Sequence, residues 1–178
     1  MMGNHSLWGK NGSLFEDVLK VPLIVYDPGK KSAKRIKETV LSTDIYPTIL
    51  GYAGIDEVHS KCEGVTLDKD VDRGGREYII SECDNRVAVV KGRYKLEWNR
   101  YIRTGQMYKE FYDLEKDPHE FENLYENPDY KNIVEDLESI LIEKEKSEKL
   151  LSTVFADIDD YPYYLDLGNG AGLLNNRG

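Results

Sequence analysis

The sequence predicts a mixed fold, in which an incomplete α/β element is followed by a small and complete α+β unit. A short apolar run at residues 21–29, VPLIVYDPG, precedes a helix pattern at residues 41–55, and a strand followed by a helix is typical of α/β proteins. Four strand patterns in close succession then lead into a long helix pattern. Consecutive strands joined by short turns favour an antiparallel meander over a parallel sheet.

The composition is that of a folded, acidic protein. Of the 178 residues, 40% are hydrophobic and 11% are aromatic, which is enough for a core and argues against global disorder. The 33 acidic residues outnumber the 24 Lys and Arg, and the net charge of -9 produces a field that repels phosphates. We therefore expect neither nucleic acid nor a membrane as a partner. No apolar run approaches the roughly 18 residues that a membrane span requires.

The α/β element needs more chain than residues 1–60 supply. The run at residues 21–29 is short, rich in β-branched residues and ended by a Pro-Gly pair, so we expect a buried strand. The helix after it is expected to begin at Ser42–Asp44 and to end at Gly54. A strand of this kind is normally covered on both faces. Residues 1–60 are therefore predicted to be the end of a larger domain.

Residues 61–150 carry the pattern of a small α+β domain, and residues 151–178 are predicted to form an extended tail. Strands are expected at Glu77–Glu82, Arg86–Val90, Arg93–Trp98 and from Tyr108 onward, with a two-residue turn at Lys91–Gly92. A helix introduced by Asn127-Pro128-Asp129 should pack an apolar stripe on the sheet. The side chains expected to be buried there are Ile133, Leu137, Ile140 and Leu141 on the helix and Ile79, Val87, Val89 and Leu96 on the strands.

Five segments in order resemble the carboxyl-terminal third of the sulfatases. They are HSLWGKNGSLFEDVLKVPLIVYDPG, LSTDIYPTILGYAGI, REYIISE, VVKGRYKLEW and FYDLEKDPHEFENLYENPDY, and their order and spacing fit over roughly residues 2–145. The resemblance is closest to bacterial enzymes that act on sulfated sugars or aryl sulfates. It implies that residues 1–60 end an alkaline-phosphatase-like α/β domain. It also implies that a four-stranded antiparallel sheet with a packed carboxyl-terminal helix follows.

The resemblance implies a sulfuric ester hydrolase with two groups that this chain is not expected to hold. One is a formylglycine, made from the Cys or Ser of a C-x-P-S-R motif, and neither Cys62 nor Cys83 stands in such a motif. The other is a metal ion, usually calcium, whose acidic and amide ligands are expected in a missing amino-terminal portion. The chain alone is therefore expected to be inactive. Its expected partners are that missing portion and a sulfated small molecule or glycan.

Three residues near the start are site candidates by resemblance. Lys10 matches a lysine that contacts the sulfate, and an ammonium group with three donors suits that task. His5 matches a histidine at the rim of the site, where it could bind substrate or assist the leaving group, but a structural role is equally open. Trp8 could line the pocket or simply pack in the core. Other polar candidates are interpreted as structural: Glu16, Asp44, Arg86, Lys91, Arg93, Asp117 and His119.

Two alternatives remain open on the sequence alone. A phosphodiesterase or phosphonate monoester hydrolase of the same superfamily shares the fold and often the terminal motifs. A non-catalytic binding or structural module is favoured by the complete pattern of the second unit and by the lack of a recognisable nucleophile. The motifs upstream of the present chain would separate these possibilities.

Overall fold

The computed structural model describes residues 2–10, 12–29, 33, 35–55, 62–67, 75–101 and 104–148. These residues fall into two compact units, and each is described by itself. One unit is Leu23–Glu77, and the other joins the described residues of Met1–Pro22 to those from Tyr78 onward. The border between these units does not coincide with the domain boundary expected near residue 60. That domain boundary stays a prediction. The predicted tail at residues 151–178 lies outside the described residues.

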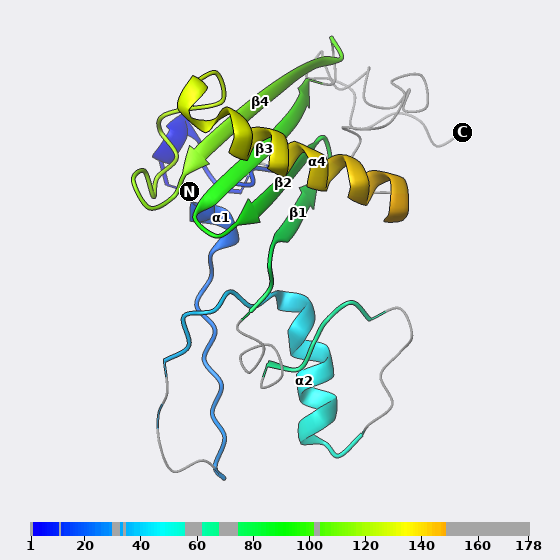
Figure 1. Cartoon of the computed structure of the whole chain (residues 1–178). Helices are drawn as coiled ribbons and strands as arrows, with labels where there is room; N and C mark the ends of the chain where they lie inside the picture. Colours follow the sequence, from blue (N-terminus) through cyan, green and yellow to red (C-terminus); the bar gives the residue numbers. More distant parts are fainter. Residues whose placement is uncertain are drawn as a thin grey trace, which may run out of the picture. The chain divides into compact units, whose positions relative to one another are not determined.

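The second unit is built on a four-stranded antiparallel sheet in the order β1-β2-β3-β4 (Figure 1). The strands are β1 (Ile79–Cys83), β2 (Arg86–Lys91), β3 (Tyr94–Tyr101) and β4 (Gln106–Asp113). The predicted meander is thus confirmed. The turn between β2 and β3 is Gly92–Arg93, one residue later than expected, because Lys91 pairs with Tyr94. Gly92 takes a positive φ of 61°, which glycine adopts without strain.

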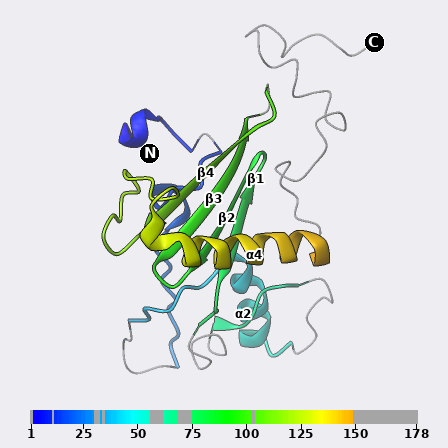
Figure 2. The same cartoon turned by 45° about the horizontal axis from the view of Figure 1, so that its top comes forward.

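One long helix, α4 (Lys131–Glu148), crosses a face of this sheet (Figures 1 and 2). A 3-10 turn, η3 (Pro128–Tyr130), precedes it. The Asn127 side chain accepts a hydrogen bond of 3.0 Å from the backbone N–H of Asp129, so the predicted start signal caps this turn.

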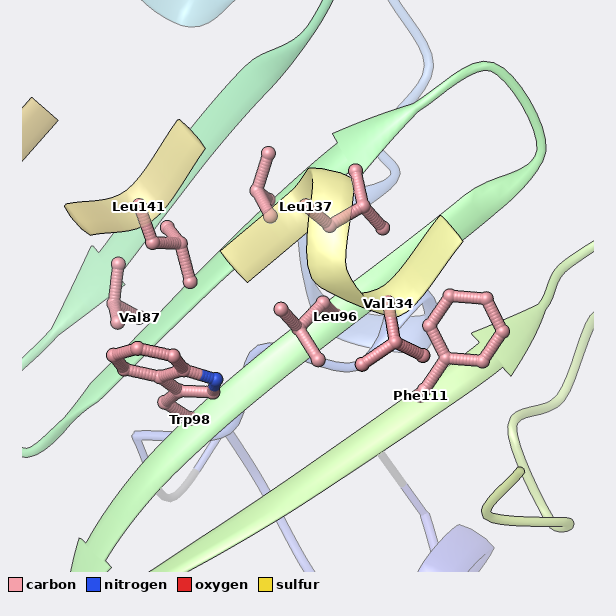
Figure 3. Close-up of a cluster of buried hydrophobic side chains, with 8 residues drawn as sticks. Val87, Leu96, Trp98, Phe111, Val134, Leu137 and Leu141 are labelled. Atoms are coloured by element: carbon pink, nitrogen blue, oxygen red, sulfur yellow. The ribbon is translucent and has the colours of Figure 1, made fainter. Parts of the chain in front are cut away.

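The hydrophobic core lies between α4 and the sheet (Figure 3). Its buried members are Val87, Val89, Leu96, Trp98, Phe111, Val134, Leu137 and Leu141. Ile133 and Ile140 pack against this core while partly exposed. Ile79 was assigned to the wrong face, because Val89 faces α4 and its partner across the β1–β2 ladder is Ile80. Neighbouring residues of a strand point to opposite faces, so Ile79 points away from α4.

The opposite face of the sheet is covered by the amino-terminal segment. This segment holds the 3-10 turn η1 (Asn4–Ser6) and the short helix α1 (Glu16–Leu19), and both views place α1 behind the sheet relative to α4 (Figures 1 and 2). Leu14 and Phe15 are buried there. A segment from the start of the chain therefore completes the layer structure of the sheet domain.

The Leu23–Glu77 unit is organised around the buried carboxylate of Asp44. The 3-10 turn η2 (Ser42–Asp44) leads into α2 (Ile45–Tyr52), as the sequence predicts. Asp44 accepts hydrogen bonds from the backbone N–H groups of Leu41 and Val65 and from both terminal nitrogens of Arg76. Burial alone would raise the pKa of Asp44, but the Arg76 bonds and the two amide bonds outweigh it and leave that pKa lowered. The predicted structural role of Asp44 thus extends beyond capping a helix.

The expected buried strand at residues 21–29 is not formed. The backbone of residues 21–27 belongs to no strand or helix, and its apolar side chains lie in solvent, with Ile24 91% exposed. A strand is stabilised by pairing with a neighbour, and no strand lies beside this segment among the residues that the structure describes. The prediction of a buried strand is therefore wrong for the residues that the structure describes, which supply no strand to pair with it.

Replacing Leu137 by Ala should lower the free energy of unfolding of the sheet unit by about 2–5 kcal/mol, because the side chain is fully buried and its loss leaves a cavity. Urea unfolding followed by Trp fluorescence would measure the change. Ile142→Ala, on the same helix but 41% exposed, is the matched control and should cost far less. Equal losses for the two variants would contradict the packing described above.

Candidate functional site

The candidate site centres on a tight turn that presents Lys10 to solvent. The side chain of Lys10 is exposed, while its carbonyl oxygen accepts a hydrogen bond of 2.9 Å from the N–H of Ser13. Gly12 has a positive φ of 62°, and a side chain there would meet the Cys83 sulfur at 3.6 Å. Gly12 therefore lies close to the end of β1, and the hydrogen bond to Ser13 ties the Lys10 backbone to the buried residues that follow, while the Lys10 side chain extends into solvent.

A buried cluster of charged groups holds the chain that follows this turn. We call it the anchor cluster and define it as Lys95, Glu120, Glu16 and the carbonyl group of Leu14. Lys95 of β3 is fully buried, and its ammonium group donates to the Leu14 carbonyl oxygen and, at 2.6 Å, to Oε1 of Glu120. Oε2 of Glu120 accepts from the N–H of Glu16 at 2.6 Å. The Glu16 carboxylate completes the cluster, 3.6 Å from the Lys95 nitrogen.

The Lys95 and Glu120 side chains of the anchor cluster are almost completely excluded from water, and this affects their charges. Glu120 is 2% exposed, and burial raises its pKa although the charge of Lys95 and two hydrogen bonds act in the opposite direction. Glu120 also has a positive φ of 57°, an uncommon conformation for a residue with a side chain. The surrounding structure must therefore hold Glu120 in place.

Lys95 and Glu120 were not identified from the sequence. The sequence places Lys95 at a polar position of an alternating strand, where a solvent-facing side chain is the ordinary expectation. The available signal was the DPHE turn at residues 117–120, whose last residue follows the predicted turn without an assigned role. Glu16 was interpreted as structural, and its contacts in the anchor cluster agree with that interpretation.

His5 lies in an aromatic stack rather than in an open pocket. Its ring is parallel to that of Phe15, with 3.7 Å between ring centroids, and 5.1 Å from that of Phe121. Its Nε2 atom is buried and finds no hydrogen-bond partner among the described residues. His5 also has a positive φ of 54°, and strained residues of this kind often mark functional sites. The geometry accounts for a packing role, and the buried Nε2 atom is unpaired among the described residues.

Trp8 does not line a pocket in the described chain. Its side chain is 71% exposed, and its backbone forms an isolated antiparallel bridge with Met2. The bridge closes the short loop that carries His5, because Met2 and Trp8 flank η1. The role of Trp8 as a pocket wall therefore remains a prediction.

A second buried ion pair lies on the same face of the sheet as the anchor cluster. Arg86 donates to Oε1 of Glu97 at 2.7 Å, and Glu97 is fully buried. Oε2 of Glu97 has no hydrogen-bond partner among the described residues. Burial raises the pKa of Glu97, although the charges of Arg86 and Lys95 oppose this, and Glu110 adds to it. This pair bonds within the sheet, whereas the anchor cluster joins the sheet to the amino-terminal segment.

The described residues do not fit the calcium site that the resemblance implies. No group of three or more His, Cys, Asp or Glu within the described ranges is arranged to hold a metal ion. The buried carboxylates of Asp44, Glu97, Asp113 and Glu120 instead each face a Lys or Arg side chain. Within the same part of the chain, no helix has the length and hydropathy to cross a bilayer.

A meander sheet covered by a helix on one face and by a lysine-bearing segment on the other matches the arrangement expected for the carboxyl-terminal portion of a sulfatase. A family model described as N-sulphoglucosamine sulphohydrolase, C-terminal, matches residues 3–147. Because this match covers most of the chain, the chain belongs to that family. The amino-terminal segment and the sheet domain are therefore parts of one family unit.

Several curated relatives are sulfatases by name. An arylsulfatase from Clostridium perfringens is 32% identical over 155 residues, which are 81% of this chain and 31% of that protein. A choline-sulfatase from Rhizobium meliloti is 32% identical over 137 residues, or 72% and 25% of the two chains. A Delta 4,5-hexuronate-2-O-sulfatase from Bacteroides thetaiotaomicron is 28% identical over 155 residues, or 79% and 31%. The chain thus spans less than a third of the length of each of these relatives.

Solved structures are similar to this chain over a comparable part of their own length. The phosphonate monoester hydrolase of Agrobacterium radiobacter aligns with a TM-score of 0.49 at 20% identity, over 65% of this chain and 26% of that chain. A 2-O GAG sulfatase aligns with a TM-score of 0.44 at 28% identity, over 58% of this chain and 24% of that chain.

The stability of the sheet unit should depend on pH through Glu97. A raised pKa means that the folded state binds the proton more tightly than the unfolded state, for which the ordinary value is 4.5. The contribution of Glu97 is therefore fully present below that value and is lost as the pH rises through the folded pKa. The loss is about 1.4 kcal/mol for each unit by which the pKa is raised.

Urea unfolding of the wild type and of Glu97→Gln between pH 4 and 7.5 would measure this effect. Glutamine keeps the shape and does not titrate, so the wild type should lose stability relative to the variant as the pH rises. A difference between the two that moves in the opposite direction would show that the Arg86 charge dominates.

Proposed function

We propose that this chain is the carboxyl-terminal part of a sulfuric ester hydrolase that acts on sulfated sugars or aryl sulfates, with Lys10 contacting the sulfate. The observation that carries the proposal is the exposed Lys10 side chain on a backbone whose carbonyl group is hydrogen-bonded to the N–H of the buried Ser13. A compact cation held in this way is ready to meet an anionic group without reorganising the backbone. The relatives named as sulfatases support this class of substrate.

In the proposed reaction, the chain supplies binding and electrostatic stabilisation. The Lys10 ammonium group would donate to sulfate oxygens and stabilise the negative charge that develops as the ester bond breaks. His5 is proposed to act at the rim of the site, because its stacked ring is held firmly and one ring nitrogen lacks a partner in the described chain. The nucleophilic formylglycine and the calcium ion that the resemblance implies are proposed to belong to the amino-terminal portion.

The proposed partner is that amino-terminal portion, and the segment at residues 21–26 is its proposed docking strand. Val21, Ile24 and Tyr26 are 72%, 91% and 86% exposed, and both faces of the segment are apolar. A strand of this composition is typically buried inside a parallel sheet. An α/β sheet in the partner could supply both the neighbouring strand and the helices that cover it.

A second candidate is a phosphoester or phosphonate hydrolase of the same superfamily. One relative, 29% identical over 160 residues, is named a multifunctional alkaline phosphatase superfamily protein, from Trinickia caryophylli. A lysine at the position of Lys10 serves a phosphoryl group as well as a sulfuryl group, since both present anionic oxygens. Comparing aryl sulfate with aryl phosphonate turnover in an assembled enzyme would separate the two.

The isolated chain should not hydrolyse sulfate esters. Losing a catalytic nucleophile commonly lowers turnover by a factor on the order of a million, and this chain is proposed to lack both the nucleophile and the metal ligands. The purified chain, incubated with an aryl sulfate and calcium, should release product at the background rate. Turnover that survives repurification and disappears in Lys10→Ala would overturn this expectation.

The role of Lys10 can be measured in a chimera that places the amino-terminal part of the Clostridium perfringens arylsulfatase before this chain. Lys10→Ala should lower kcat by roughly 100- to 1000-fold, as expected for the loss of one donor to a developing oxyanion. Lys20→Ala, which removes another exposed lysine from the same segment, is the matched control and should keep full activity. An active chimera that is insensitive to Lys10→Ala would refute the proposed sulfate contact.

A further inference from the structure

We propose that Lys95 and Glu120 are positioning residues for Lys10, because their buried ion pair holds the turn that presents the Lys10 ammonium group. The inference rests on the proposed function, which gives Lys10 its sulfate contact. It adds two buried residues that bond to the chain directly after the turn, at Leu14 and Glu16.

The first argument is that buried groups of the anchor cluster are hydrogen-bonded across long sequence separations. The Leu14 carbonyl accepts from Lys95, which lies 81 positions later in the chain, and the Glu16 N–H donates to Glu120, which lies 104 positions later. Each carboxylate oxygen of Glu120 has one partner, since Oε1 receives the Lys95 ammonium and Oε2 receives the Glu16 amide. Moving the loop would leave buried polar groups without partners, which is costly.

The second argument is the short path from the anchor to Lys10. Ser13, Leu14 and Phe15 are buried, and the N–H of Ser13 is bonded to the carbonyl oxygen of Lys10. The Ser13 hydroxyl also accepts from the N–H of Phe15 at 3.2 Å, which fixes the backbone between the turn and α1. A displacement at Leu14 is therefore passed directly to the Lys10 backbone.

The third argument is energetic. Two charges in a dry environment pay a large desolvation penalty, and well-packed apolar side chains in their place are often neutral or more stable. Stability alone therefore gives little reason for an ion pair at this position. An apolar pair could not bind the Leu14 carbonyl and the Glu16 amide, because it has no donor or acceptor. These two hydrogen bonds fix the position of residues 14–16 on the sheet.

The Arg86–Glu97 pair provides an internal control for this argument. It lies on the same face of the same sheet, Glu97 is buried as completely as Glu120, and burial raises the pKa of both carboxyl groups. Its hydrogen bond joins β2 to β3 and does not involve the Lys10 turn. Removing the charge from Glu97 should therefore disturb the sheet without disturbing the turn.

Hydrogen exchange of the whole chain, without any partner, tests the positioning directly. Glu120→Gln and Lys95→Met should each raise exchange at the Ser13, Glu16 and Leu19 amides by roughly 10- to 100-fold, as expected for loss of a hydrogen bond to a charged group. Amides of the β2–β3 ladder should exchange as in the wild type, and Glu97→Gln should leave the turn amides unchanged. Unchanged protection of the turn in both anchor variants, or equal loss in the turn and in the ladder, would overturn the inference.

Kinetics in the chimera test the link to Lys10. Glu120→Gln should lower kcat, and the loss should nearly vanish when it is measured in a Lys10→Ala background, since a positioning residue acts through the group that it positions. Losses that simply multiply would show that Glu120 acts on stability alone. Full activity of Lys10→Ala would refute both the proposed function and this inference. A strong Lys10→Ala loss with an unchanged turn in hydrogen exchange would refute the inference alone.

Discussion

The burial of one ammonium group constrains the arrangement of the amino-terminal segment on the sheet. Lys95 is excluded from water, so its charge must be satisfied by acceptors from the protein itself. These three acceptors come from two separated parts of the chain: the Leu14 carbonyl and the Glu16 carboxylate lie near its start, and Glu120 lies after β4. Only an arrangement that brings all three to one place leaves the charge compensated. The same requirement fixes α1 and the turn before it.

The sheet therefore joins two different kinds of interface. The face toward α4 is apolar and is held by close packing of side chains such as Leu96 and Leu137 (Figure 3). The other face carries Lys95 and Glu97 at alternate positions of β3 and is held by directional, charge-assisted bonds. Packing tolerates small shifts, whereas bonds between buried charges require defined geometry. The segment that carries Lys10 lies on the second kind of surface, so its position depends on directional bonds.

The meander and α4 were predicted correctly from the sequence. The alternation of apolar residues in the strands and their helical spacing in α4 both mark the face that is buried in the core. Ile79 was misassigned, since Ile79 and Ile80 are both apolar and alternation cannot choose between them. The apolar pattern at residues 21–29 predicted a strand that the structure does not form, because no described strand lies beside it to pair with it. At the candidate site, the resemblance identified the exposed lysine. The anchor cluster was missed because Lys95 and Glu120 are 25 positions apart and read individually as surface charges.

The long sequence separations within the anchor cluster also set an order of events during synthesis. Residues near the start of the chain emerge from the ribosome well before β3 and the turn at Glu120, which are 81 and 104 positions distant from their partners. Until then, α1 is a single short turn of helix, too short to be stable alone. Closing loops of this length also carries an entropic cost. The Lys10 turn is thus made before the sheet and takes its final position only after β3 and the Glu120 turn have been made.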